Sequence, residues 1–107
     1  MSLPFLSARL AMLTAGAFGM VIASRASIAG AQGGCQAECG SAAAMAAAAL
    51  TEVMGGTPQQ CADACAMAIA SQLGLVCDPI AGLVEIPFIK RNVSGLMIAF
   101  SSADMAL

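Results

Sequence analysis

Apolar side chains occupy almost every position of the first long segment, residues 5–24. A helix that is apolar on all sides is normally buried on all sides. Gly16 and Gly19, together with several alanines, would let a neighbouring helix approach closely. We therefore expect a helix over residues 5–24 that lies in the middle of a helical bundle, followed by a glycine-rich loop over residues 26–34.

Alanine dominates the next segment, residues 35–54, which also contains the larger apolar side chains of Met45 and Leu50. Alanine is the strongest helix former, so the composition predicts a second helix that begins near Cys35. The two glycines at positions 55 and 56 supply a helix stop at its end. The pattern predicts a helix over residues 35–54.

A new helix is indicated directly after these glycines. Thr57 is a capping residue and Pro58 suits the first helical position, where no backbone N–H is needed. Gly74 then provides the next stop. We expect this third helix to run from Pro58 to about Leu73.

Residues 75–87 form the least regular stretch, because Asp78-Pro79, Gly82 and Pro87 interrupt any continuous helix or central strand. We expect an irregular loop that carries Cys77. A last helix is predicted to begin after Phe88 and to continue through residue 104. The fold class that follows is all-α, a compact bundle of about four helices rich in alanine and glycine.

The composition indicates that the chain is part of a larger assembly and not a self-contained domain. The 107 residues suffice for one small domain, but 60% are hydrophobic and only 9% are charged. Such a chain has too few charged side chains for the surface of a monomer. We expect residues 1–107 to be a partial domain of a longer protein, with no terminating signal at Leu107, whose apolar faces are covered in a homo- or hetero-oligomer.

Several other classes of protein fit the chain poorly. The uncharged run over residues 10–24 is shorter than the roughly 20 residues that span a bilayer, and Arg25 closes it. Arg9 stands without the basic cluster that begins a secretory signal peptide. The net charge is −2, and neither Trp nor Tyr is present to stack on bases. We expect neither a membrane span nor a nucleic-acid partner.

The chain contains five cysteines and no histidine. An odd number leaves at least one thiol outside any disulfide scheme, so a reducing, cytoplasmic location is the simpler expectation. Two pairs are spaced four apart, Cys35 with Cys39 and Cys61 with Cys65, and could form a disulfide-stapled hairpin. The interpretation that we favour makes Cys61 and Cys65 small core residues. Cys77 lies in irregular backbone next to Asp78-Pro79, where a thiolate is better able to turn toward a cofactor.

Several of these stretches, taken together and in order, resemble the alpha chain of the iron–sulfur-dependent bacterial L-serine dehydratases. The resemblance covers nearly the whole chain and includes SIAGA (27–31), GCQAECG (34–40), GGTP (55–58), GLVCDPIAGLVE (74–85), IPFIKRN (86–92) and ADMAL (103–107). It implies a lyase of amino-acid degradation and gluconeogenesis that converts L-serine to pyruvate and ammonia. It also implies a separate beta chain or domain as a partner.

The resemblance implies a [4Fe–4S] cluster held by three cysteines, with one iron left open for the substrate. Carried over to this sequence, Cys35 is the first ligand and Cys77 is the second. The third position, cysteine in the family pattern, is Phe88 here. Phenylalanine offers no thiolate, so we expect cluster assembly in this chain to be impaired. Cys39 is one helical turn from Cys35 and is a candidate substitute, although no family motif supports it.

The implied mechanism is Lewis-acid catalysis, in which the open iron binds the serine hydroxyl while a base removes the α-proton. The chain has no histidine, and Glu38, Asp78 and Glu85 are the carboxylates near the cysteines. We expect the base to lie outside this chain. Lys90 and Arg91 could attract the substrate carboxylate, or they could form an exposed basic turn.

The prediction for function is therefore part of an L-serine dehydratase, inactive by itself. The alternative is a non-catalytic helical interaction module, or a degenerate relative that lacks the cluster.

Overall fold

The computed structural model describes residues 3–25, 35–73 and 85–107, and this part of the chain consists of four helices with no strand. The helices are α1 (Leu3–Arg25), α3 (Cys35–Val53), α4 (Pro58–Ser71) and α5 (Glu85–Ala106). The all-α prediction is confirmed. The predicted loops over residues 26–34 and 75–84 lie outside the described residues.

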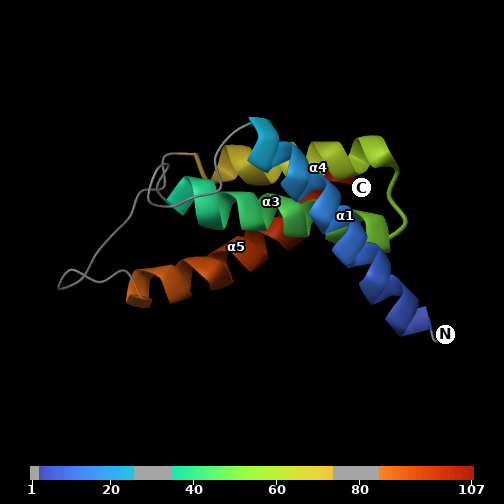
Figure 1. Ribbon diagram of the computed structural model, residues 1–107, viewed down its shortest axis with the longest axis horizontal. Coiled ribbons are helices and arrows are strands. Elements are labelled where there is room, and N and C mark those ends of the chain that lie inside the picture. The colour runs from blue at the N-terminus through green and yellow to red at the C-terminus, as the bar shows by residue number, and fades with distance from the viewer. Residues whose placement is uncertain (1–2, 26–34, 74–84) are drawn as a thin grey trace.

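Helix α3 is the centre of the arrangement, because α1, α4 and α5 all pack against it (Figure 1). Helix α4 returns antiparallel to α3, and α5 runs parallel to α3 and also packs against α4. The core consists mainly of small side chains from these three helices, among them Ala44, Ala47, Ala48, Cys61, Ala64, Ala68 and Ala99. Small side chains let the helix axes approach closely, which explains why an alanine-rich segment has the most neighbours.

The turn between α3 and α4 follows from the residues predicted to make it. Gly55 has a φ of 88°, a conformation that glycine adopts without steric cost. The Gly56 N–H donates to the Thr51 carbonyl at 2.8 Å, and the Gly55 N–H donates to the Glu52 carbonyl at 3.1 Å. These two bonds form a Schellman motif that satisfies carbonyls at the end of α3.

Helix α4 begins with a capping box. The Thr57 hydroxyl accepts a hydrogen bond from the Gln60 N–H, and the Gln60 side-chain oxygen accepts one from the Thr57 N–H. Pro58 occupies the first helical position, as predicted. The predicted helix start is confirmed, while the helix ends at Ser71, two residues earlier than Leu73.

The prediction that the first helix is buried on all sides was wrong. Helix α1 packs mainly on α3, and none of its residues from Leu6 to Arg25 is buried. Phe18 and Ile22 contact the core, whereas Met12 and Met20 are exposed on other sides of the helix. The helix crosses α3 obliquely, and its N-terminal turns extend past the other helices (Figure 1). Helix α1 is therefore apolar on all sides, but the other described helices cover only one side of it.

The length expected to exclude a membrane span does not exclude one. Within the described residues, one segment, Leu6–Arg25, has the 20-residue length and the apolar composition of a span. The sequence-based count began after Arg9 and so came out shorter. Length and composition are weak evidence, since a signal sequence or a helix covered by protein passes the same test.

The last helix begins earlier than predicted. Helix α5 starts at Glu85, so Pro87 lies in its first turn instead of ending a loop. Proline is tolerated there because the first N–H groups of a helix have no intrahelical acceptor. Phe88 is therefore a helical residue, and Lys90 lies in the second turn of α5.

Candidate functional site

The positions that the family resemblance assigns to cluster ligands begin two helices. Cys35 is the first residue of α3, and Phe88 lies one turn into α5. Both helices start at the same end of the molecule and run in the same direction (Figure 1). Cys77 lies outside the described residues, and the described side chains do not include those of Cys35 and Phe88.

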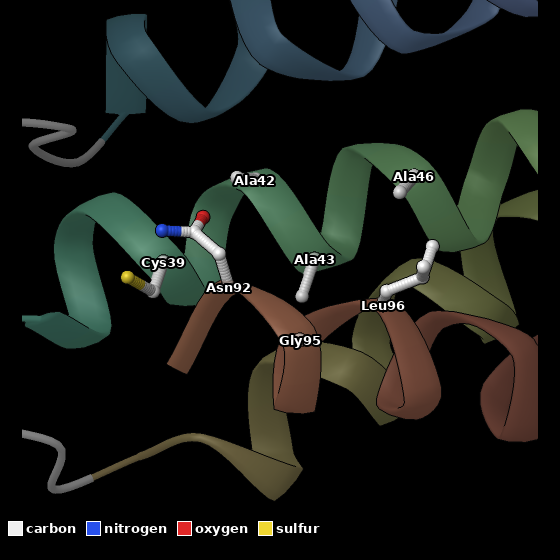
Figure 2. Close-up of a pocket in the computed structure, with 7 residues that line it drawn as sticks. All are labelled: Cys39, Ala42, Ala43, Ala46, Asn92, Gly95 and Leu96. Atoms are coloured by element: carbon white, nitrogen blue, oxygen red, sulfur yellow. The ribbon is translucent and has the colours of Figure 1, made fainter. Parts of the chain in front are cut away.

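A pocket of 140 Å³ lies between α3 and α5, one turn further along both helices (Figure 2). Cys39 and Asn92 form one end of it, and Ala46 and Leu96 form the other. Cys39 follows Cys35 by four residues, and Asn92 follows Phe88 by four. The pocket thus begins about one helical turn beyond each of the two family positions.

Close approach of α5 to the other two core helices forms the base of this region. A Cβ added at Gly95 would lie 3.6 Å from both the Ala43 Cβ and the Gln72 Nε2. Gln72 is 3% exposed, and its Oε1 has no hydrogen-bond partner within the described part of the chain. Buried amide oxygens without a partner are uncommon. Sequence reasoning missed Gln72, because a glutamine in the last turn of a predicted helix normally faces solvent.

The thiols of Cys61 and Cys65 are core groups. They are 1% and 7% exposed and form no disulfide, so the stapled-hairpin alternative was wrong and the favoured interpretation is confirmed. The Cys61 Sγ donates to the Glu52 Oε2 at 3.5 Å. Burial raises the pKa of the Cys61 thiol, and the hydrogen bond to Glu52 raises it further. Burial likewise raises the pKa of the Cys65 thiol. Both sulfurs remain protonated at neutral pH, as expected of buried core thiols.

The described residues contain no group of three or more His, Cys, Asp or Glu side chains that could hold a metal ion. Glu38 is exposed in the first turn of α3, and Lys90 is exposed on α5. Asp78 lies outside the described residues, as do the side chains of Glu85 and Arg91. No candidate base or substrate-binding cation is therefore brought to the Cys39–Asn92 pocket by the described side chains.

Comparison with known proteins decides the family. The family model described as serine dehydratase alpha chain matches residues 6–107, which include all four helices from the second turn of α1 onward. The chain belongs to the serine dehydratase alpha chain family. The matched stretch includes Cys35 and Phe88, the two helical positions that the resemblance assigns to cluster ligands.

Curated members of this family are similar in sequence but longer. The chain is 62% identical over 96 residues to a probable L-serine dehydratase alpha chain of Bacillus subtilis, covering 90% of this chain and 32% of that protein. It is 64% identical to a probable L-serine dehydratase alpha chain of Latilactobacillus sakei, covering 90% of this chain and 46% of that protein. It is 60% identical over 95 residues to the L-serine dehydratase alpha chain of Peptoniphilus asaccharolyticus, covering 89% and 32%. The chain thus spans 32% to 46% of the length of these three relatives.

Proposed function

We propose that this chain supplies the cysteine-bearing helical part of the alpha chain of an L-serine dehydratase. In this proposal it takes part in the conversion of L-serine to pyruvate and ammonia together with further alpha-chain sequence and a beta chain or domain, in the cytoplasm, and is inactive alone. The family match over residues 6–107 carries the proposal. The names of the relatives, which specify an alpha chain, support a partner subunit.

The geometry supports a functional site at the end where α3 and α5 begin. Cys35 and Phe88 lie at that end, and the Cys39–Asn92 pocket starts one turn inside it. Sites built on helices are positioned more precisely than sites built on loops. Two of the three family ligand positions belong to helices of one packed pair.

The residues present do not fit a [4Fe–4S] cluster as the family pattern requires. Cys35 and Cys77 supply two thiolates, whereas the third position is Phe88, whose side chain has no metal-binding atom. Cys39, the candidate substitute, is buried at the end of the pocket. We therefore assign no chemical step in this chain to a cluster, and propose that Phe88 impairs its assembly.

Anaerobic reconstitution with iron and sulfide tests this proposal. The measured quantities are bound iron and sulfide and the visible absorption of the chain, its Phe88→Cys variant and a Phe88→Ser control. We expect the cysteine variant to bind about four irons per chain and the other two to bind far less, because a cubane is usually held by three or four thiolates.

Each other result has a defined meaning. Cluster formation by the unaltered chain that is abolished by Cys39→Ala would assign the third ligand to Cys39 and contradict the role given to Phe88. Equal failure of all three proteins, repeated with the rest of the alpha chain and the beta chain supplied, would reject the cluster assignment.

Two features of the chain favour a second candidate, a non-catalytic helical interaction module. Phe88 removes a ligand, while large apolar side chains such as Leu13, Met20 and Met97 are exposed. A chain that has lost catalysis but still assembles with its partners would have both features. Serine-dependent pyruvate release by the complete assembly would favour the catalytic candidate, and its absence would favour the interaction module.

A further inference from the structure

A long apolar groove runs beside the bundle, between α1 and the α3–α5 pair. Its volume is 410 Å³ and no charged residue lines it. Helix α3 lines it with Ala42, Ala46 and Ala49, which recur at the spacing of one helix face, and with the larger Met45, Leu50 and Val53. The short side chains among these leave room for the ridge of another helix to approach closely.

Large apolar side chains form the margins of the groove. Met12 of α1, Met45 of α3 and Leu96 of α5 line it, and Met12 is 75% exposed. Exposed apolar surface of this kind is normally covered in the functional assembly. The groove therefore requires an apolar occupant.

The groove adjoins the candidate site. Ala42, Ala46 and Leu96 line both the groove and the Cys39–Asn92 pocket. An occupant of the groove would thus lie beside residues that also line the pocket. Its contacts would connect this chain's outer face to the region proposed for function.

We propose that the groove is the docking site of an apolar helix from the alpha-chain sequence that lies outside the matched stretch. The matched stretch is 32% of the Bacillus subtilis alpha chain, so about two thirds of that relative is available to supply it. Helices α3 and α5 and the groove residues of α1 all lie within the residues that the family model matches. The proposal depends on family membership and is independent of whether the cluster or the dehydratase activity is present.

The choice of a helix over a lipid surface or a second copy follows from shape and charge. A concave groove lined by alanines and larger apolar side chains accepts the ridge of one helix, whereas binding to a bilayer surface uses an outward-facing apolar side of a helix. A second copy of this chain would have to insert an apolar helix of its own. Its most exposed apolar helix is α1, which already forms one side of the groove. These two occupants remain outcomes of the test.

Oxidation of methionines by hydrogen peroxide, followed by mass spectrometry, tests the proposal. The comparison is between this chain alone and a hybrid alpha chain, defined as the Bacillus subtilis alpha chain in which this chain replaces the matched stretch. We expect oxidation of Met12 to slow by about tenfold in the hybrid, because oxidation follows exposure of the sulfur. Met105 is the internal control, since it is 63% exposed and does not line the groove.

Several results would overturn the proposal. Equal oxidation rates of Met12 in the chain and the hybrid would do so, as would equal slowing at Met12 and Met105. Protection of Met12 in the isolated chain that increases with concentration would assign the groove to a second copy. Protection by vesicles of mixed neutral and anionic phospholipid would assign it to a lipid surface.

A second measurement applies if the hybrid does not accumulate in soluble form. This chain is co-expressed with the remaining sequence of the Bacillus subtilis alpha chain, and co-purification of the two is measured. We expect Met12→Glu to reduce co-purification by at least about tenfold, because burying an unpaired carboxylate in the groove is unfavourable, and Met105→Glu to leave it unchanged. Absence of co-purification by the unaltered chain would reject the docking site.

Discussion

At the scale of single residues, Cys61 and Cys65 show how a thiol can resemble a metal ligand in sequence and be a core group in the fold. Both are buried on α4 against the alanines of α3 and α5. Spacing alone could not separate these roles, because residues four apart share a helix face whether that face meets a metal or a neighbouring helix. The neighbours decide, and here they are mostly methyl groups.

The raised pKa values of these thiols predict a loss of stability at alkaline pH. The folded state favours the protonated thiols, while the unfolded chain ionises them near the ordinary value of 9.0. Stability from this source is complete below pH 9 and falls as the pH rises toward the folded pKa values, by at most about 1.4 kcal/mol per pH unit for each thiol. Urea denaturation between pH 7 and pH 10 measures it.

The matched control for that measurement is the double variant Cys61→Ala, Cys65→Ala. It removes both titrating groups, so its stability should be lower at pH 7 but should depend less on pH above 9. The same alkaline loss in the double variant would show that other groups cause it.

At the scale of elements, the end of α3 depends on backbone geometry at Gly55 and Gly56. A Cβ added at Gly56 would lie 2.5 Å from the Thr51 Cγ2 and 2.9 Å from the Thr51 carbonyl oxygen. Both distances are shorter than atoms tolerate, and the carbonyl cannot move without breaking the Schellman motif. The glycine is therefore required for the α3–α4 turn.

Two glycine-to-alanine substitutions should have opposite effects on the free energy of unfolding. Gly56→Ala should lower it by roughly 1–3 kcal/mol, the usual effect of forcing an extra methyl group into packed structure. Gly16→Ala should raise it by up to about 1 kcal/mol, since a Cβ there meets nothing within 4 Å and alanine favours a helix interior. Urea denaturation of the two variants and the unaltered chain tests both. A stabilising Gly56→Ala would contradict the described turn.

Local sequence predicted most element boundaries in the α3–α4 hairpin but failed at the start of α5. The Gly55–Pro58 turn depends on residues within a few positions of one another, so the local sequence is enough to predict it. Pro87 was interpreted as a loop residue because proline disrupts helix interiors. Proline is tolerated in the first turn of a helix, but the local sequence did not indicate that α5 starts as early as Glu85.

At the scale of the whole molecule, small side chains lie inside and large apolar side chains lie outside. Thr51, Cys61 and Ser102 are the largest fully buried side chains among the described residues. Hydrophobic stabilisation grows with the apolar area removed from water, so an alanine core contributes little per residue. Large apolar side chains are exposed on α1 and α5, as expected for a chain whose apolar faces contact further protein.

The complete assembly should show whether Phe88 limits activity. The hybrid alpha chain is combined with the Bacillus subtilis beta chain, reconstituted with iron and sulfide, and assayed for serine-dependent pyruvate. We expect Phe88→Cys to raise the rate at least about tenfold over the Phe88 form, as for a metal site that regains a missing ligand. The isolated chain should release no pyruvate in either form.

The control is the hybrid with Phe88→Ser, which removes the aromatic ring without adding a thiol. Activity restored equally by serine and cysteine would assign the defect to the bulk of the ring instead of the missing ligand. High activity with Phe88 itself would reject the impaired-site proposal. These outcomes are independent of the methionine oxidation result, because docking in the groove does not require a cluster.

The sequence by itself determined that the chain is helical, where α3 ends and α4 begins, and to which family the chain is related. Helix formers, glycine stops and caps act over a few residues, and family motifs are properties of residue order. The resemblance also gave the prediction that Phe88 stands at the third cysteine position of the family pattern.

Only the tertiary structure decided which helix is central and which surfaces remain open. Helix α3 is surrounded because its alanines let three helices approach it, while α1 packs mainly on α3 and has no buried residue from Leu6 to Arg25. The hydrophobic pattern ranks both segments as apolar and cannot distinguish them. Buried Gln72 and the groove beside α1 likewise depend on which helix faces meet in space, because the distances between side chains on different helices are set by packing.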